Sequence, residues 1–282
     1  MVSFGQACHL LKEGSVIAIP TETTYGLAAL YHQEEAVKKI FQLKQRPMNH
    51  PLIVHISNLD QLSLFSDDYS DYIPFIKFFW PGALTIVCQK KTSISPTITG
   101  NLETIAIRMP SHPLTLKLIE EVGPLVAPSA NYYQQLSTTT AEDVQELFPN
   151  LPILNGGICE IGVESTILYI KNHEYSILRP GPITEEDLKP FFVNFKKTSQ
   201  KIKVSGTCKT HYQPKKKVTI KNQEGITLPD NPKDFLPKLY RFLKQESLTA
   251  KEIVIQDNHK RNGLWATIWD RLSRAASQDL DL

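Results

Sequence analysis

The chain has 282 residues, 41% of them hydrophobic, and it carries 31 Lys and Arg against 29 Asp and Glu. That length can bury a sizeable core and has room for one large domain and a small one. No window approaches eighteen consecutive apolar residues, which excludes a membrane-spanning helix, and we expect a cytoplasmic protein. The four cysteines are far apart and form no Cys-x-x-Cys pair, so neither a zinc site nor a disulfide framework is expected.

The first predicted element is a strand over residues 15–19, an apolar run that Pro20 ends because proline cannot continue the hydrogen-bond ladder. Three hydroxyls follow, at Thr21, Thr23 and Thr24. Ligands of α/β proteins bind where strands of the sheet end, so we expect this loop to face a small polar molecule. A threonine-rich turn without a ligand would have the same sequence, and this motif alone does not decide between them.

A helix is predicted over residues 33–44, because Val37 and Ile40 recur at helical spacing on one buried face. Lys44 closes this helix, and Arg46 follows one residue later. Two cations at this spacing indicate a phosphate site, although a solvated Lys-x-Arg pair is the simpler alternative.

Strand-like and helix-like segments then alternate. The predicted strands cover residues 51–56, 83–89, 105–108, 125–127, 166–170 and 175–178, and the predicted helices cover residues 112–122 and 139–148. Thr139 and Glu142 have the spacing of a capping box that would begin the second helix. Interleaved strands and helices indicate an α/β domain over residues 1–195.

Residues 188–217 contain nine lysines and no acid, and removing these nine from the net charge of +2 leaves the rest of the chain near −7. This composition indicates a linker or flap, which we place at residues 196–217. It is either a solvated hinge or a contact for phosphate or RNA. Residues 218–282 form a small C-terminal domain with predicted helices over residues 235–244 and 264–276 and a strand over residues 252–255.

Further polar groups stand at predicted strand ends. Arg108 ends one strand, where a guanidinium suits a carboxylate, and Arg179 ends another. Ser129 and Asn131 follow a third strand, and residues 162–166 supply glycine and hydroxyls before a fourth. Each signal is weak alone, but together they indicate one site for a polar ligand.

Eight motifs occur in order between about residues 12 and 184. They are Pro20-Thr-Glu-Thr23 leading into Tyr25-Gly-Leu27, Lys44-x-Arg46-Pro47, Pro51-Leu-Ile-Val-His55, Trp80-Pro-Gly-Ala-Leu-Thr85, Arg108-Met-Pro110, Ala127-Pro-Ser-Ala-Asn131, Glu164-Ser-Thr-Ile167 and Leu178-Arg-Pro-Gly181. This series resembles the threonylcarbamoyl-AMP synthase family. A second stretch, Ser205-Gly206 through His211-Tyr-Gln-Pro214 and the terminal helix, resembles the longer two-domain form of that family.

The resemblance implies a twisted mixed-sheet YrdC-like domain with a concave basic cleft, plus a small C-terminal α/β domain. It also implies that ATP, L-threonine and bicarbonate become threonylcarbamoyl-AMP and pyrophosphate, and that a tRNA-modifying threonylcarbamoyl transferase acts downstream. Carried over by position, the threonine site comprises Thr23, His55, Arg108, Ala127 and Ser165. The ATP site comprises Lys44, Arg46, His50, Thr104, Ser129, Asn131, Ser137, Arg179 and Tyr212.

This chemistry needs positioning and charge neutralisation more than a protein nucleophile, because a carbamate oxygen attacks the α-phosphorus while pyrophosphate leaves. Lys44 and Arg46 are the candidate catalytic residues, since they can neutralise the triphosphate. Mg²⁺ would arrive with ATP and bridge its oxygens, and no acidic metal cage is evident in the sequence. We expect Tyr212 to be the contact through which the linker closes over the site as a lid.

The chain departs from the family pattern at several positions. His50 stands where the family usually has asparagine, which makes a nucleotide contact there uncertain. Residues 132–135 replace a serine-glycine turn and change the local backbone freedom. The cations and hydroxyls persist, so we expect an active enzyme.

Two other classes stay open. One is an RNA-binding or ribosome-maturation module, which the lysine-rich segment favours modestly through a weak RNA contact. Lysines without interleaved aromatics are, however, poor evidence of base recognition. The other is an ATP-dependent carbamoyltransferase component, although no zinc fingers or acylphosphatase-like segment accompany the domain.

Overall fold

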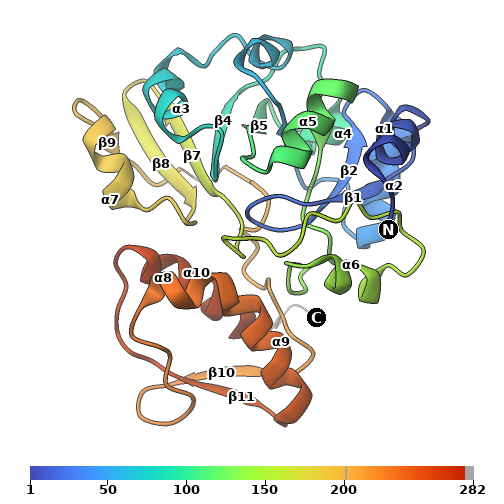
Figure 1. The fold of residues 1–282 in the computed structure, drawn as a ribbon. Coiled ribbons are helices and arrows are strands. Elements are labelled where there is room, and N and C mark those ends of the chain that lie inside the picture. The colour runs from blue at the N-terminus through green and yellow to red at the C-terminus, as the bar shows by residue number, and fades with distance from the viewer. Residues whose placement is uncertain (201, 277–282) are drawn as a thin grey trace.

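The computed structural model describes residues 1–200 and 202–276, which form a large N-terminal unit and a smaller C-terminal unit (Figure 1). Within these residues, nine strands of the large unit form one mixed sheet in the order β1-β2-β6-β3-β5-β4-β7-β8-β9. In the smaller unit, β10 and β11 pair in parallel and helices pack beside them. The predicted mixed-sheet α/β fold with a small C-terminal α/β domain is confirmed.

The strands of the large sheet are β1 (Ile17–Ile19), β2 (Gly26–Leu30), β3 (Ile53–His55), β4 (Leu84–Gln89), β5 (Thr104–Arg108), β6 (Leu125–Val126), β7 (Thr166–Lys171), β8 (Glu174–Arg179) and β9 (Lys196–Lys197). Its α-helices are α1 (Phe4–Lys12), α2 (Glu34–Lys44), α3 (Ile73–Phe79), α4 (Pro96–Thr99), α5 (Pro113–Val122), α6 (Ala141–Leu147) and α7 (Glu185–Leu188), and short 3₁₀ turns cover Leu59–Leu64, Ser70–Tyr72 and Lys189–Phe191. The smaller unit contains β10 (Val218–Lys221), α8 (Pro232–Phe235), a 3₁₀ turn (Leu236–Lys238), α9 (Leu239–Thr249), β11 (Ile253–Gln256) and α10 (Leu264–Ala276).

Side chains of the large sheet alternate between its two faces, as they must along a pleated strand. On one face, Val54 and Ile107 belong to the main core, which α2 and α3 help to build. On the other face, α1 and α5 cover the end of the sheet that contains β1, β2 and β6. The neighbouring part of that second face carries a smaller cluster, in which Ile53 of β3 lies with Val204 of the linker. The linker is therefore packed on the sheet.

The strand directions bring several candidate side chains together at the same end of the sheet's central strands. β3 and β5 are parallel and place His55 in register with Arg108. β4 runs antiparallel to β5 and puts Thr85 beside Arg108. β7 is parallel to β4, so Ser165, which precedes it, lies at the same edge, and β8 returns antiparallel to end there at Arg179. Residues far apart in sequence thus meet because the sheet is mixed.

The N-terminal cap of α6 differs from the prediction by one residue. The hydroxyl of Thr140 accepts a hydrogen bond from the Asp143 N–H (3.1 Å), and the Asp143 carboxylate accepts bonds from the N–H and hydroxyl of Thr139. The predicted Thr139–Glu142 capping box is wrong. Thr139 and Thr140 each have an acid three residues later, Glu142 and Asp143, and the sequence pattern does not distinguish the two.

Some predicted boundaries also shift. β9 pairs with β8, so the first two residues of the predicted linker belong to the edge of the large sheet. The predicted helix over residues 235–244 is divided between α8, a 3₁₀ turn containing Pro237, and α9, because proline lacks the N–H of a continuous helix. Residue 201 of the linker and residues 277–282 of the C-terminal domain lie outside the described residues.

The core of the smaller unit is shared with the rest of the chain. Its buried cluster is built from α9, α10, β10 and β11, and it also contains Val163 of the large unit and Tyr212 of the linker. About 65 residues form a marginal core on their own. The smaller unit therefore gains stability by packing on the large one.

We expect Leu243→Ala to lower the free energy of unfolding by about 2–5 kcal/mol, because Leu243 is fully buried in this shared core. Leu248 lies on the same helix but is 71% exposed, so Leu248→Ala is the matched control with an effect within about 0.5 kcal/mol. Urea unfolding of the full chain, followed by tryptophan fluorescence, measures both. The shared core predicts one transition, and two transitions of which Leu243→Ala moves only one would contradict it.

Candidate active site

A small cavity lies where these strand ends meet. Its walls contain four cationic side chains, Lys44, Arg46, Arg108 and Arg179, and one carboxylate, Glu164. Other predicted site residues on its walls are Thr23, His55, Ala127, Ser129, Asn131, Ser165 and Tyr212. A low-dielectric cavity with this excess of positive charge favours an anionic ligand.

The loop after β1 is held in shape by the hydroxyl of Thr21. This hydroxyl donates to the carbonyl of Thr24 (2.6 Å) and accepts bonds from the N–H groups of Thr23 and Thr24 (3.2 and 3.1 Å). Such side-chain bonds replace the backbone ladder that Pro20 ends. The loop is buried and rigidly bonded, and it directs the hydroxyl of Thr23 toward Arg108.

Arg108 is held by three groups. It donates to the carboxylate of Glu22 (2.6 Å), the hydroxyl of Thr23 (2.8 Å) and the carbonyl of Gly82 (3.1 Å). Arg108 and Glu22 are nearly inaccessible to solvent, and the second carboxylate oxygen of Glu22 has no partner among the described residues. Glu22 is a site residue that the sequence interpretation did not single out, although it lies inside the Pro-Thr-Glu-Thr motif. The charge of Glu22 fixes the direction in which the guanidinium of Arg108 points.

His55 is a buried, neutral imidazole beside this arginine. Burial, and then the charge of Arg108, lower the pKa of His55 to about 3. Its Nδ1 atom is buried without a partner among the described residues. An orphaned polar atom in a cavity wall costs free energy, so it indicates a place for a ligand donor or acceptor.

Ser165 connects the ends of two strands, β4 and β8, on this side of the cavity. Its hydroxyl lies 2.7 Å from that of Thr85 and accepts a bond from Arg179 (3.0 Å). The same guanidinium donates twice to the Ser165 carbonyl (3.0 and 2.8 Å) and once to the Ser205 carbonyl of the linker (3.0 Å). Arg179 therefore clamps the loop before β7 to the linker.

The two cations after α2 make different contacts. The Lys44 ammonium donates to the carbonyls of Ser129 (2.5 Å) and Asn131 (2.7 Å), and burial together with Arg46 holds its pKa well below the usual range. Arg46 donates to the carbonyl of Pro51 (2.8 Å), and its Nε has no partner among the described residues. Burial is the main cause that lowers the pKa of Arg46 to about 10, so it stays charged at neutral pH. Arg46 keeps a free donor for an anion, whereas Lys44 mainly shapes its neighbouring loop.

The linker closes the cavity. Ser205, Gly206, His211 and Tyr212 all line it, and Tyr212 is fully buried. Gly206 has a φ of +79°, and a Cβ there would lie 2.6 Å from the Tyr212 hydroxyl, so glycine is required at this close approach. The space left in the cavity is about 40 Å³, enough for only a few water molecules. A ligand as large as a nucleotide would fit only after the linker moved.

Three predicted ATP-site residues are not among those that line the cavity. Thr104 begins β5, at the opposite end from Arg108. His50 does not line the cavity but contacts the hydroxyl of Tyr133 (3.4 Å), which does. Ser137 donates to Glu164 (2.5 Å) and lines a separate cavity. Their nucleotide contacts stay predictions.

Two features are absent from the part of the chain that the structure describes. No group of three or more His, Cys, Asp or Glu side chains in residues 1–200 and 202–276 is placed to hold a metal ion. None of the helices in this part of the chain combines the length and apolar character needed to span a bilayer.

Comparison with known proteins identifies the relatives of this arrangement. A model of the Sua5, YciO and YrdC proteins, described as telomere recombination, matches residues 9–181. The chain belongs to this family. A threonylcarbamoyl-AMP synthase from Pyrococcus abyssi is 31% identical over 315 residues, which cover 96% of this chain and 93% of that protein. The threonylcarbamoyl-AMP synthase of Bacillus subtilis is 44% identical over 224 residues, 74% of this chain and 64% of that protein, so the chain spans just under two thirds of this relative.

Solved structures of the Sua5/YciO/YrdC family share the fold. The crystal structure of Pyrococcus abyssi Sua5 complexed with L-threonine matches with a TM-score of 0.89 and 29% identity, covering 98% of this chain and 95% of that one. Escherichia coli YciO matches with a TM-score of 0.58 and 23% identity, covering 67% of this chain and 92% of that one. The match to Sua5 extends over both units.

The buried histidines predict a loss of stability in acid. Burial is the main cause that lowers the pKa of both His55 and His211 to about 3, whereas an unfolded histidine titrates near 6.5. Only the unfolded chain binds these protons between those values, so the stability is complete above about pH 7 and falls as the pH drops from about 6.5 toward 3. Each histidine should lower the free energy of unfolding by about 2 kcal/mol at pH 5 relative to pH 7.

Urea unfolding at the two pH values tests this. His55→Gln should reduce the loss by about 2 kcal/mol, and the matched control is His9→Gln, at a side chain that is 68% exposed. An equal pH dependence in the parent and His55→Gln would refute the assignment.

Proposed function

We propose that this chain is an L-threonylcarbamoyladenylate synthase, a nucleotidyltransferase that converts ATP, L-threonine and bicarbonate into threonylcarbamoyl-AMP and pyrophosphate. The observation that carries the proposal is one closed cavity in which the Arg108 fork and the neutral His55 stand beside the cations Arg46 and Arg179. The first pair suits an amino acid and the second a polyphosphate. The named relatives support this activity and not an RNA-binding module or a carbamoyltransferase component.

The threonine subsite follows from the donors and acceptors on the cavity wall. Arg108 has N–H groups in addition to those that bind Glu22 and Thr23, and these can take the substrate carboxylate. His55 is neutral and can accept a hydrogen bond through its free Nδ1, which would orient the substrate amine for attack on bicarbonate. The hydroxyl of Ser165 and the backbone of Ala127 complete the subsite. L-threonine in the related Pyrococcus structure supports this substrate.

The ATP subsite uses the remaining cations. Arg46, with its free Nε, and Arg179 would offset the charge of the triphosphate as pyrophosphate leaves. Lys44 would act by shaping the loop of Ser129 and Asn131 and by adding its donor to the phosphates. When bound with ATP, Mg²⁺ would supply further charge neutralisation, and the phosphate oxygens themselves could provide most of its ligands. We expect these contacts to position the carbamate oxygen in line with the α-phosphorus.

The linker would act as a lid. A mixed anhydride hydrolyses readily, so closure after substrate entry protects the product by excluding water. Tyr212 and the neighbouring His211 form the only His-Tyr dipeptide in the chain and line the cavity. A structure of Pyrococcus abyssi Sua5 in which a consecutive histidine and tyrosine are replaced by alanine has also been solved. The product would pass to a threonylcarbamoyl transferase that modifies tRNA.

The proposal predicts that the purified chain releases pyrophosphate from ATP only when both threonine and bicarbonate are present. Labelled threonine should appear in a nucleotide product with one phosphate. Measuring pyrophosphate with each substrate omitted in turn provides the controls. Pyrophosphate release that is independent of threonine, or no release with all substrates and Mg²⁺, would overturn the proposed function.

Two arginine variants should separate the subsites. Arg108→Ala should raise the KM for threonine by roughly ten- to a thousandfold with a much smaller effect on ATP, because a carboxylate partner is lost. Arg46→Ala should weaken ATP use by a similar factor, because a charge-assisted phosphate contact is lost. Steady-state kinetics with each substrate varied distinguishes them. Equal effects of both variants on both substrates would contradict separate subsites.

A further inference from the structure

Helix α10 of the smaller unit presents one face to the active site. Thr267, Arg271 and Arg274 recur at positions i, i+4 and i+7, which lie on one side of a helix. Thr267 donates to the carbonyl of Gly181 (2.7 Å), and Arg274 donates to the carbonyl of Cys208 in the linker (2.5 Å). The opposite face of α10 packs into the core of the smaller unit.

Arg271 lies at the centre of this face and is completely buried. It donates to the carboxylate of Glu164 (3.1 Å) and to the carbonyl of Pro180 (3.0 Å), and it pairs with Asp270. Its guanidinium also lies over the ring of Tyr212, 4.8 Å from the ring centre. One side chain therefore touches two residues of the cavity wall, Glu164 and Tyr212.

Glu164 depends on partners from both units. Its carboxylate accepts bonds from the hydroxyls of Ser137 (2.5 Å) and Tyr240 (2.7 Å) as well as from Arg271. Burial by itself would raise the pKa of Glu164, but Arg271, Arg179 and these hydroxyls lower it to about 2. The next residue along the chain is Ser165, so the position of Glu164 sets that of a predicted threonine contact.

Tyr212 is held in an unfavourable backbone conformation. Its φ is 60°, in the left-handed region that bulky residues avoid. Such a conformation persists only where the surroundings impose it. Here the Tyr212 ring stacks on Tyr240 with centres 5.6 Å apart and lies against Arg271. Both of these contacts come from the smaller unit.

We propose that α10 completes the active site and that Arg271 is a positioning residue, which holds Glu164 in the cavity wall and Tyr212 of the lid in its closed conformation. The kinetic part of this inference rests on the proposed function. Arg271 acts through other residues, since it is not among those that line the cavity. The smaller unit is in this way part of the catalytic machinery.

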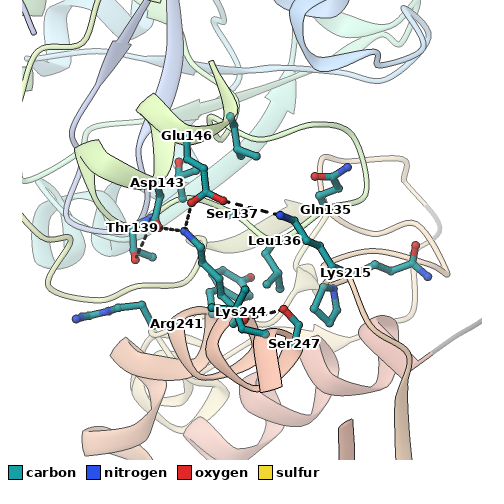
Figure 2. A pocket seen from close by; sticks show the side chains of 16 residues that line it. Gln135, Leu136, Ser137, Thr139, Asp143, Glu146, Lys215, Arg241, Lys244 and Ser247 are labelled. Carbon is teal, nitrogen blue, oxygen red and sulfur yellow. Dashed lines mark hydrogen bonds and ion pairs between the residues drawn. The ribbon is translucent and has the colours of Figure 1, made fainter. Parts of the chain in front are cut away.

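A second bridge between the units provides a matched control. Lys244 of α9 donates to Asp143 and Glu146 of α6 (2.7 Å each), as Figure 2 shows. This bridge lies in a separate cavity between the units and its lysine is 41% exposed. It joins the same two units without contacting Glu164 or Tyr212, and Lys244 itself has no ion pair with the described residues of the lid, whose Lys215 lies 3.9 Å from Glu146.

The first measurement needs no substrate. The lid contains Lys203 and Lys209, which trypsin can cut when the lid opens. Arg271→Met should speed cleavage there about tenfold in the full chain, whereas Lys244→Met should leave the rate within about twofold. If Arg271→Met does not fold, Arg271→Lys replaces it, because lysine keeps the charge but cannot make the same set of directed bonds. Equal cleavage rates in the parent and the Arg271 variant would overturn the proposal.

The second measurement uses the pH profile of threonine-dependent pyrophosphate release. The groups that face Glu164 are Ser137, Arg179, His211, Tyr212, Tyr240, Arg271 and, from α2, Lys44. Removing the charge of Arg271 should raise the pKa of Glu164, so Arg271→Met should lose activity on the acid side at a higher pH than the parent. At pH 7.5 its kcat/KM for threonine should fall roughly tenfold to a hundredfold, and Arg271→Lys should recover part of the loss.

The control separates positioning from simple attachment of the two units. Lys244→Met should keep the parent pH profile and kcat/KM within about twofold. If both methionine variants lose activity equally with an unchanged pH profile, the smaller unit is only attached and the proposal is wrong. If the parent makes no product while the trypsin rates differ as expected, the proposed function fails and the role of α10 in holding the lid stands.

Discussion

Burying four cations around one cavity is costly, and much of the structure offsets that cost. Removing a charge from water is favourable only where hydrogen bonds or opposite charges compensate. The Arg108 guanidinium donates hydrogen bonds to Glu22 and Thr23. Arg179 donates to the carbonyls of Ser165 and Ser205. Lys44 donates to two carbonyls of the neighbouring loop. The carboxylates near the cavity are outnumbered by its cations, so an anionic ligand would complete the compensation.

The lid also compensates for the burial of these cations. Ser205 supplies a carbonyl to Arg179 and a hydroxyl near Arg46 (3.4 Å), contacts that phosphate oxygens could also make. The linker thus occupies positions next to these two cations. If phosphate contacts replaced the linker contacts as the lid opened, the arginines would stay hydrated or paired at every stage of the proposed reaction. Such an exchange costs less than exposing bare cations in a dry cavity.

The smaller unit acts through charge as well as packing. Arg271 brings a fifth buried cation toward the site, and its partner Glu164 also faces Arg179. Glu164 lies between Arg179 of the large unit and Arg271 of the smaller one. It couples the two units, because moving either arginine changes the interaction of Glu164 with the other. The shared apolar core around Val163 and Tyr212 excludes water from this network and strengthens it.

Much of the fold could be predicted from local pattern. Helix α10 begins and ends at the predicted residues, and the strands around Val54 and Ile107 follow from their apolar runs. Helix α1 and strand β2 were not predicted. β2 reads Gly-Leu-Ala-Ala-Leu, and alanine and glycine are poor strand formers, so burial between β1 and β6 rather than propensity makes it a strand.

The sequence by itself determined which charges and hydroxyls the chain can bring to the cavity, because the motifs name Arg46, Arg108, Ser165 and Arg179 directly. Only the tertiary structure decided which of them meet. The Glu22–Arg108 and Glu164–Arg271 pairs join residues 86 and 107 positions apart. The first depends on strand order in the large sheet, and the second depends on docking of the smaller unit. Ser137 lines a different cavity and reaches the wall of this one only through its hydrogen bond to Glu164. Local pattern constrains neighbours along the chain, whereas ion pairing in the interior depends on distances that only the packed fold determines.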